Sequence, residues 1–281
     1  MGRFSKETLL GILVLGFLVT VFALVPIPAG VGDDWETFKG ASERVLTGTP
    51  LYGERVTHAY YSNPPWLAVL LIPLGLLPFQ WGWSILCVTS LVLIVLVCRS
   101  WQIGPWKTVL VLMSPATFYL LLHGEIDALV IAGLLLPKET WLVVAATKPQ
   151  VAVGLVLGVG RERIIKAVGI AVLFFLLTLP FFGFWPLKII QQPTPFIDAA
   201  HNLWIGLWPF QVPAGIGILL LGIRRKDERF LIAASPFLSP YAATSSLLGP
   251  WMALASLLKG WEATIVFVSW WGSVIYRLLG F

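Results

Sequence analysis

Two adjacent carboxylates, Asp33 and Asp34, stand directly after residues 8–32, an apolar stretch that contains no charged residue. Carboxylates are scarce in this chain, which has 14 Asp and Glu among 281 residues. A carboxylate held at the edge of an apolar region can accept a proton from a hydroxyl group, as a general base does. The alternative is that one of the pair caps a helix and the other is a solvated loop charge.

A second group of ionisable residues, His123, Glu125 and Asp127, interrupts a long apolar segment. Burial of such groups demands polar partners, so these residues are candidates for binding the hydroxyl groups of a substrate. The alternative is a solvent-exposed turn in which Glu125 and Asp127 stand near a helix N-terminus, where negative charge is favourable. Both interpretations are compatible with the sequence.

Lys148 is the best candidate for binding a phosphate group, because it stands beside Pro149 inside an apolar run, where an ionisable side chain is costly. The alternative is a short turn from which the lysine extends to water. Arg44, Arg55 and Lys188 are further candidates for phosphate binding, and the planar guanidinium group of arginine suits the geometry of phosphate. A solvated loop residue is the competing interpretation for each of these three.

Two more residues complete the candidate site. Tyr61 offers an aromatic face on which the ring of a ligand can stack, and His201 stands at the end of a second polar loop, from which it can contribute to the same site. For a lone histidine, a structural role is the competing interpretation. The sequence contains no clustered His and Cys residues of the kind that bind zinc, so we expect neither a metal nor another cofactor.

The composition predicts a protein embedded in a membrane. Hydrophobic residues make up 58% of the chain and charged residues 12%, whereas a soluble domain carries roughly 25% charged residues. This supply of polar side chains is too small to cover a soluble enzyme of this size. The net charge of +5 does not indicate a nucleic-acid partner, because the basic residues form small clusters between apolar runs, as loop residues that set membrane topology do.

The charge-free windows predict an all-α bundle of about 9 to 12 membrane helices. They form one domain over residues 1–281. The window 8–32 is long enough to cross a bilayer, and 66–98 predicts a short helix, a turn marked by two prolines, and a long helix from about residue 82. The stretch 140–160 is either one helix kinked at its proline or two short helices, and this choice decides which side His123 faces.

Lysine and arginine set the expected orientation, because the cytoplasmic loops of membrane proteins are enriched in them. The N-terminus and the basic clusters at 161–166 and 224–229 are therefore expected inside. This arrangement places the loops 33–64 and 185–205 outside. We expect a multi-pass protein of the cytoplasmic membrane whose active site, in the first external loop, faces outward.

The first external loop is expected to contain an amphipathic helix over residues 36–48 that lies flat at the membrane surface. Its apolar face comprises Trp35, Phe38, Ala41, Val45 and Leu46. Asp33 or Asp34 can cap the N-terminus of this helix, because a side-chain oxygen there accepts a free backbone N–H. Gly48 can end it.

The first external loop and the segment after it resemble a known family. The matching residues are Asp34, Phe38, Ala41, Gly48, Tyr52, Tyr60 to Pro65, Pro73, Leu77 and Pro78. This order is similar to the first loop and second helix of the polyprenol-phosphate-mannose-dependent mannosyltransferases, which belong to the C-type (GT-C) superfamily of membrane glycosyltransferases. Looser matches are Gly124 to Asp127, Lys148 with Pro149, and Ser239 with Pro240. Glu125 and Asp127 stand where the family has Gln and Asn.

The resemblance implies an inverting, metal-independent glycosyltransferase that takes a sugar, mannose, from a polyprenyl-phosphate carrier. Asp34 matches the catalytic aspartate of the family, and Asp33 is the alternative if the match slips by one residue. The implied partners are the polyprenyl-phosphate sugar donor, a glycolipid or glycan acceptor, and membrane lipids.

Two functions of other classes stay open. A transporter or flippase for a lipid-linked substrate would share the apolar chain and its sparse charges, but it would be expected to contain paired inverted halves. We find no such correspondence between residues 1–140 and 141–281. A non-catalytic subunit of a membrane complex would agree with the altered segment at Glu125 and Asp127.

Overall fold

The computed structural model describes residues 6–24, 31–192 and 201–279. All regular secondary structure in these ranges is helical, apart from an isolated bridge between Arg55 and Tyr60. The predicted all-α class is therefore confirmed. Three parts of the sequence predictions lie outside the described residues: the first residues of the basic N-terminus, residues 25–30 of the first apolar window, and residues 193–200 of the second external loop.

The α-helices follow one another along the chain in sixteen segments, several of them a single turn or two long. They are α1 (Lys6–Leu24), α2 (Asp33–Thr47), α3 (Pro65–Leu70), α4 (Ile72–Gly75), α5 (Phe79–Ser100), α6 (Pro105–Leu112), α7 (Pro115–His123), α8 (Asp127–Ala132), α9 (Trp141–Thr147), α10 (Pro149–Ala152), α11 (Ile164–Phe182), α12 (Trp185–Gln191), α13 (Val212–Arg225), α14 (Glu228–Ala234), α15 (Leu248–Leu257) and α16 (Gly260–Leu278). Short 3-10 helices are η1 (Gly133–Leu135), η2 (Lys138–Thr140), η3 (Val153–Gly158), η4 (Ser235–Leu238) and η5 (Thr244–Leu247).

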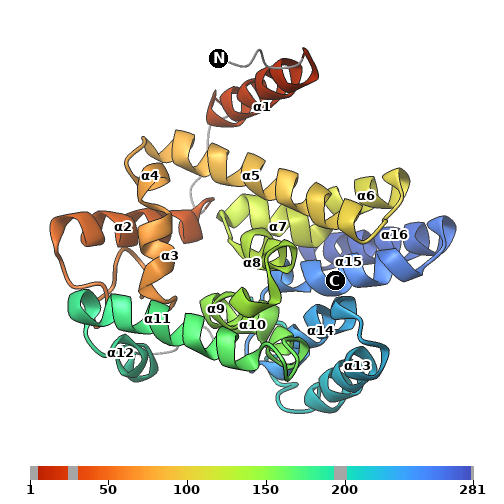
Figure 1. The fold of residues 1–281 in the computed structure, drawn as a ribbon. Helices are drawn as coiled ribbons and strands as arrows, with labels where there is room; N and C mark the ends of the chain where they lie inside the picture. Colours follow the sequence, from red (N-terminus) through yellow and green to blue (C-terminus); the bar gives the residue numbers. More distant parts are fainter. Residues whose placement is uncertain (1–5, 25–30, 193–200, 280–281) are drawn as a thin grey trace.

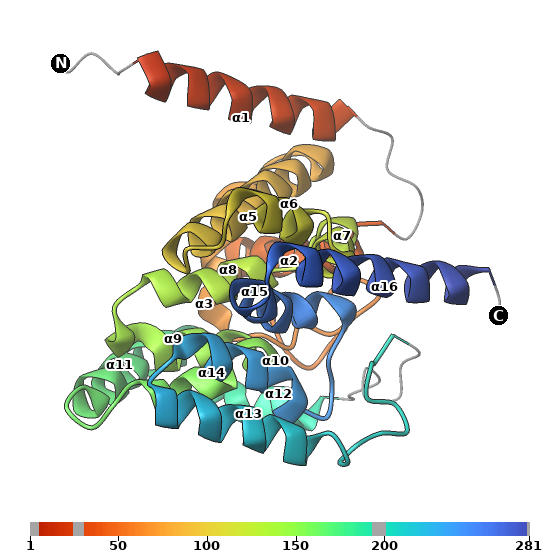
Figure 2. The ribbon, with the colours of Figure 1, turned by 90° about the vertical axis from the view of Figure 1, so that its right-hand side faces the viewer.

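The helices stack in layers (Figures 1 and 2). Helix α1 is outermost and packs against α5, and α8 packs on the other side of α5. Helix α14 packs between α13 and α15, and its residue Ile232 is fully buried. Helix α11 runs along the edge of the molecule opposite α5, where it contacts α9 and α3.

Two of the described helices, α5 and α11, are long and apolar enough to span a membrane. Helices α6 and α7 would form a third span if the pair, which is bent by 47°, is counted as one. The described helices do not by themselves confirm the larger number of spans predicted from the apolar windows. The reason is that prolines and short 3-10 turns divide many of these windows into helices too short to cross alone.

The predicted order of elements over residues 66–98 is confirmed. Helices α3 and α4 form the short first part, the chain turns at residues 76–78, and the long helix α5 begins at Phe79 rather than near residue 82. Pro78 is extended, with ψ of 148°, and its carbonyl accepts the N–H groups of Trp81 and Gly82. Proline thus fixes the start of α5 three residues earlier than expected.

The predicted helix in the first loop is confirmed as α2, and Gly48 ends it in the left-handed conformation, with φ of 68°. The predicted cap is wrong, because Asp33 and Asp34 lie in the first turn and Gly32 precedes the helix without a side-chain cap. Trp35, Phe38 and Ala41 are buried as expected, but Leu46 is 51% exposed.

Residues 140–160 form two short α-helices, α9 and α10, followed by η3. The break falls at Lys148, whose backbone is extended with φ of −148° and ψ of 85°. The ring of Pro149 disfavours the helical conformation of the residue before it, which explains the break. The alternative of two short helices is therefore confirmed, and Lys148 is turned out of the helical path.

Candidate functional site

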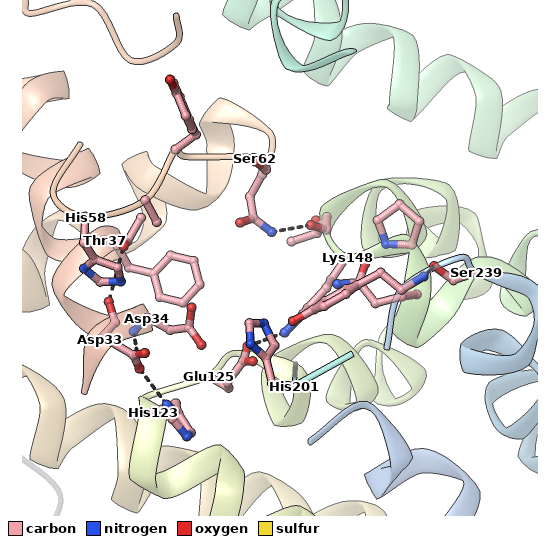
Figure 3. Close-up of a pocket in the computed structure, with 18 of the residues that line it drawn as sticks. Asp33, Asp34, Thr37, His58, Ser62, His123, Glu125, Lys148, His201 and Ser239 are labelled. Carbon is pink, nitrogen blue, oxygen red and sulfur yellow. Dashed lines mark hydrogen bonds and ion pairs between the residues drawn. The ribbon is translucent and has the colours of Figure 1, made fainter. Parts of the chain in front are cut away.

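A cavity of about 770 Å³ lies beside the N-terminus of α2. It is lined by most of the residues that the sequence singled out: Asp33, Asp34, Arg55, His123, Glu125, Lys148 and His201. Figure 3 shows Asp33 and Asp34 on one side, with Glu125, Lys148 and His201 across from them. These residues come from α2, the loop between α2 and α3, the end of α7 and the turn after it, the break after α9, and the loop before α13. Segments far apart in the sequence thus build one site.

Four predicted site residues lie outside this cavity: Asp127, Tyr61, Arg44 and Lys188. Asp127 is completely buried, where its carboxylate contacts Lys148. Tyr61 is also fully buried, and its hydroxyl donates to the carbonyl of Pro64 at 3.0 Å, so its ring is not available for stacking on a sugar. Arg44 lines a different cavity, near the C-terminus of α2.

Two glycines bring α2 and α7 into contact at the cavity. The N–H of Gly32 donates to the carbonyl of Leu122 at 2.8 Å. Gly124 ends α7 with φ of 71°, a conformation that L side chains rarely adopt. A Cβ atom on Gly124 would lie 2.6 Å from the Cβ of Trp35, so only glycine fits without displacing α2.

Asp33 is engaged by His123 at this junction. Its Oδ1 atom lies 2.6 Å from Nδ1 of His123, and the ring of Tyr119 lies against the imidazole with 4.1 Å between ring centroids. Partial burial by itself raises the pKa of Asp33. The hydrogen bond and the charge of His123 together lower the pKa by more than burial raises it, so the net shift is downward. Asp33 therefore stays ionised and holds the imidazole in place.

Asp34 behaves differently from its neighbour. Its side chain keeps some exposure because it lines the cavity, yet the surrounding protein removes most of its contact with water. This desolvation, which outweighs the nearby positive charge of Lys148, raises the pKa of Asp34 to about 6. A carboxylate with such a pKa is ionised at neutral pH and is a better proton acceptor than an ordinary aspartate.

A buried ion cluster lies behind Asp34. The ammonium group of Lys148 contacts Oε2 of Glu125 and lies 2.5 Å from Oδ2 of Asp127. The hydroxyl of Ser245 donates to the other oxygen of Glu125 at 3.4 Å. The alternative of an exposed turn is thus wrong for Glu125 and Asp127, which are 5% and 0% exposed. The alternative in which Lys148 extends to water is also wrong, since its ammonium group contacts the carboxylates of Glu125 and Asp127.

Arg55 also lines the cavity, but unlike Lys148 it forms no ion pair with a described carboxylate. Among the described residues, no carboxylate lies within ion-pair distance of its guanidinium group. Its guanidinium carbon is 5.9 Å from the ring centroid of Tyr60. On the opposite wall, the imidazole of His201 meets the ring of Tyr241 edge to face at 5.8 Å.

Three titratable residues that line the cavity were missed by the sequence predictions: His58, Tyr119 and Tyr241. Tyr119 stands four residues before His123, so the helical repeat could have placed the two rings on one face. Tyr241 directly follows the Ser239–Pro240 pair. His58 belongs to an irregular part of the first loop, where no periodic pattern points to it.

Comparison of the chain with protein-family models, with curated proteins and with solved structures finds no significant match.

Proposed function

We propose that the chain is a membrane glycosyltransferase of the GT-C type, which moves mannose from a polyprenyl-phosphate carrier to a hydroxyl group of a membrane-associated acceptor. The observation that carries the proposal is the position of Asp34 in the lining of the cavity, with a pKa raised to about 6. The resemblance of the first loop to the mannosyltransferase family supports the same assignment.

The reaction follows from these positions. Asp34 accepts the proton of the acceptor hydroxyl while the hydroxyl oxygen attacks the anomeric carbon of the donor sugar. The bond between that carbon and the phosphate oxygen breaks, polyprenyl phosphate leaves with the bonding electrons, and the anomeric centre inverts. Arg55 stabilises the charge on the departing phosphate, because its guanidinium group faces no competing carboxylate.

The charge distribution supports an outward-facing site. Ser245, which precedes α15, contacts Glu125 at the cavity, and α15 then runs away from it towards Lys259. At this far end Lys107 donates to the carbonyl of Leu258 at 3.0 Å, and Arg99 ends α5. Basic residues at the end opposite the cavity agree with a cytoplasmic location of that end. In the proposed arrangement, the shorter helices pack within a bundle of about 9 to 12 membrane segments.

The proposal is tested with the purified full chain in detergent micelles or nanodiscs, supplied with radiolabelled polyprenyl-phosphate mannose and a membrane-lipid acceptor fraction. Transfer of label should fall by about 100-fold or more in Asp34→Asn, since general-base catalysis contributes roughly that much. Asp33→Asn is the matched control, because it removes the neighbouring carboxylate and should retain measurable transfer.

Equal transfer by wild type and Asp34→Asn would show that Asp34 is not the base. Movement of the lipid-linked sugar across the bilayer without a new glycosidic bond would indicate a flippase instead. The absence of both activities in the folded wild type would favour a non-catalytic subunit.

A further inference from the structure

A second cavity, of about 500 Å³, lies at the other end of α2. It is bounded by the last turn of α2, the end of α11 and Lys188 of α12 (left side of Figure 1). It shares no lining residue with the cavity of Asp34. Arg44 and Lys188 are its cations, and Asp34 and Arg44, ten residues apart on one helix, are separated by about 15 Å. The two cavities are therefore distinct sites.

Both cations of the second cavity contact neutral groups. The guanidinium of Arg44 donates to the carbonyls of Pro50 and Arg55 at 2.9 and 2.6 Å, and Lys188 donates to the carbonyl of Phe182 at 2.9 Å. In the described part of the chain, no carboxylate forms an ion pair with either of them. A guanidinium group has five N–H donors and an ammonium group has three, so both keep donors for an anion.

The surroundings of this cation pair are apolar and uncovered. Only 11% of the apolar window of α11 is buried inside the molecule. At the cavity itself Phe181 is 82% exposed, and Val69, on α3, is 44% exposed. An apolar helix with such a bare surface is suited to contact with lipid chains. Arg44 and Lys188 lie beside the C-terminal end of this helix. The phosphates of a bilayer lie just beyond the hydrocarbon core that such a helix would cross.

We propose that this second cavity binds the phosphate group of an anionic lipid, with Arg44 and Lys188 as its ligands and the lipid chains lying along α11. The site goes beyond the proposed glycosyl transfer, because it lies apart from Asp34 and does not depend on the reaction there. A phospholipid of the bulk membrane and a polyprenyl phosphate offer the same chemistry, a lipid-borne phosphate at the membrane surface.

The full chain in detergent micelles is titrated with phosphatidylglycerol and, separately, with polyprenyl phosphate, and bound lipid is counted by native mass spectrometry. Lys188→Gln and Arg44→Gln should each weaken binding about tenfold, as expected when one charge-assisted hydrogen bond to phosphate is lost. Arg161→Gln is the matched control, because it removes an exposed charge at the opposite end of α11 and should leave the affinity unchanged. Thermal unfolding of each variant confirms that it is folded.

Lys188→Gln is the decisive variant. The side chain of Lys188 is exposed and forms one hydrogen bond to a backbone carbonyl, so its replacement disturbs little of the fold. Unchanged affinity for both lipids in Lys188→Gln would overturn the proposal. Displacement of the lipid by millimolar inorganic phosphate alone would also overturn it, because the site would then select a soluble anion. Tighter binding of polyprenyl phosphate would assign the site to the carrier, and equal binding to the bulk lipid. The titration with phosphatidylglycerol does not involve the proposed donor cavity of Asp34, so its outcome is separate from the test of transfer.

Discussion

At the scale of single residues, the two adjacent aspartates show how environment assigns different tasks to identical side chains. Asp33 meets an imidazole and its pKa is lowered, whereas Asp34 is enclosed by protein and its pKa is raised to about 6. Both aspartates line the cavity, but consecutive residues of a helix point about 100° apart, so that Asp33 meets His123 at the end of α7 and Asp34 does not. Of these two aspartates, only Asp34 has a pKa raised towards neutral pH.

The pH dependence of transfer follows from this contrast. The base must be unprotonated, so the rate should rise with pH through about 6 and level off above it, and fall about tenfold per pH unit below. The charge of Asp33 contributes to the raised pKa, so Asp33→Asn should move the midpoint to lower pH. The measurement is a pH profile of initial rates from about pH 4.5 to 8.

A profile that is flat across this range would contradict the assignment of Asp34 as base. A midpoint that moves to higher pH in Asp33→Asn would contradict the electrostatic explanation, because removal of a negative neighbour can only make Asp34 easier to ionise.

Much of the site could be predicted from residue type alone, because ionisable side chains are rare and costly in an apolar chain. Asp33, Asp34, His123, Glu125 and Lys148 were selected for this reason. The sequence does not predict which of these side chains are in contact in the fold. Lys148 contacts Glu125, 23 residues earlier in the chain, and this contact depends on the packing of α10 near α8. For the same reason, Tyr61 was expected to be accessible and is buried.

At the scale of elements, the position of the cavity lined by Asp34 depends on the junction of α2 and α7. Local sequence signals predicted one end of α2 correctly and not the other. Gly48 ends α2 as predicted, since its left-handed conformation is a local property of glycine. The start of α2 was misjudged, because it is fixed by the bond from Gly32 to Leu122 across the fold and not by a capping side chain.

Gly124→Ala tests this junction. The added Cβ would crowd Trp35 at 2.6 Å and Trp83 at 3.0 Å, in a conformation with φ of 71°. We expect a loss of about 2–4 kcal/mol in the free energy of unfolding, from the backbone conformation and from overpacking together. Transfer should also fall, since α7 carries His123. Thermal or denaturant unfolding in detergent provides the measurement.

Gly160→Ala is the control, because Gly160 has a similar φ of 78° but no atom within 4 Å of the added Cβ. It should show only the backbone part of the cost, about 1–2 kcal/mol. Equal destabilisation by the two substitutions would mean that contact with Trp35 does not fix the junction.

At the scale of the whole molecule, the class of the protein was easier to predict than its number of membrane spans. Composition depends on every residue at once, and the helical fold with α5 and α11 as candidate spans agrees with it. A count of apolar windows in the sequence does not detect the helix breaks that lie inside those windows. At Lys148, one proline divides a window that hydropathy alone presents as continuous.

The proposed orientation of α11 predicts a labelling pattern. Cysteine is introduced by Glu162→Cys before α11 and by Gln191→Cys at the last residue of α12, both at exposed positions. Cells are then treated with a membrane-impermeant maleimide. Gln191→Cys should react in intact cells, and Glu162→Cys only after permeabilisation, because basic residues beside it are expected to stay inside. Reaction of both from the same side would show that α11 does not cross the membrane.

The native cysteines allow this experiment without their removal. Cys87 and Cys98, which both lie in α5, are 1% and 0% exposed. Wild type should therefore remain unlabelled under the same conditions.

The interruption at Lys148 has a consequence beyond turning one ammonium group inward. Pro149 has no N–H, and the regular pattern of helical hydrogen bonds is interrupted around it. The N–H of Val151 donates to the carbonyl of Lys148, and the carbonyl of Thr147 instead accepts the side-chain amide of Asn63 at 2.9 Å, while the hydroxyl of Thr147 receives the indole N–H of Trp66. The break in the helix thus gives the first loop a point of attachment, so that the same proline positions both Lys148 and Asn63 in the lining of the cavity.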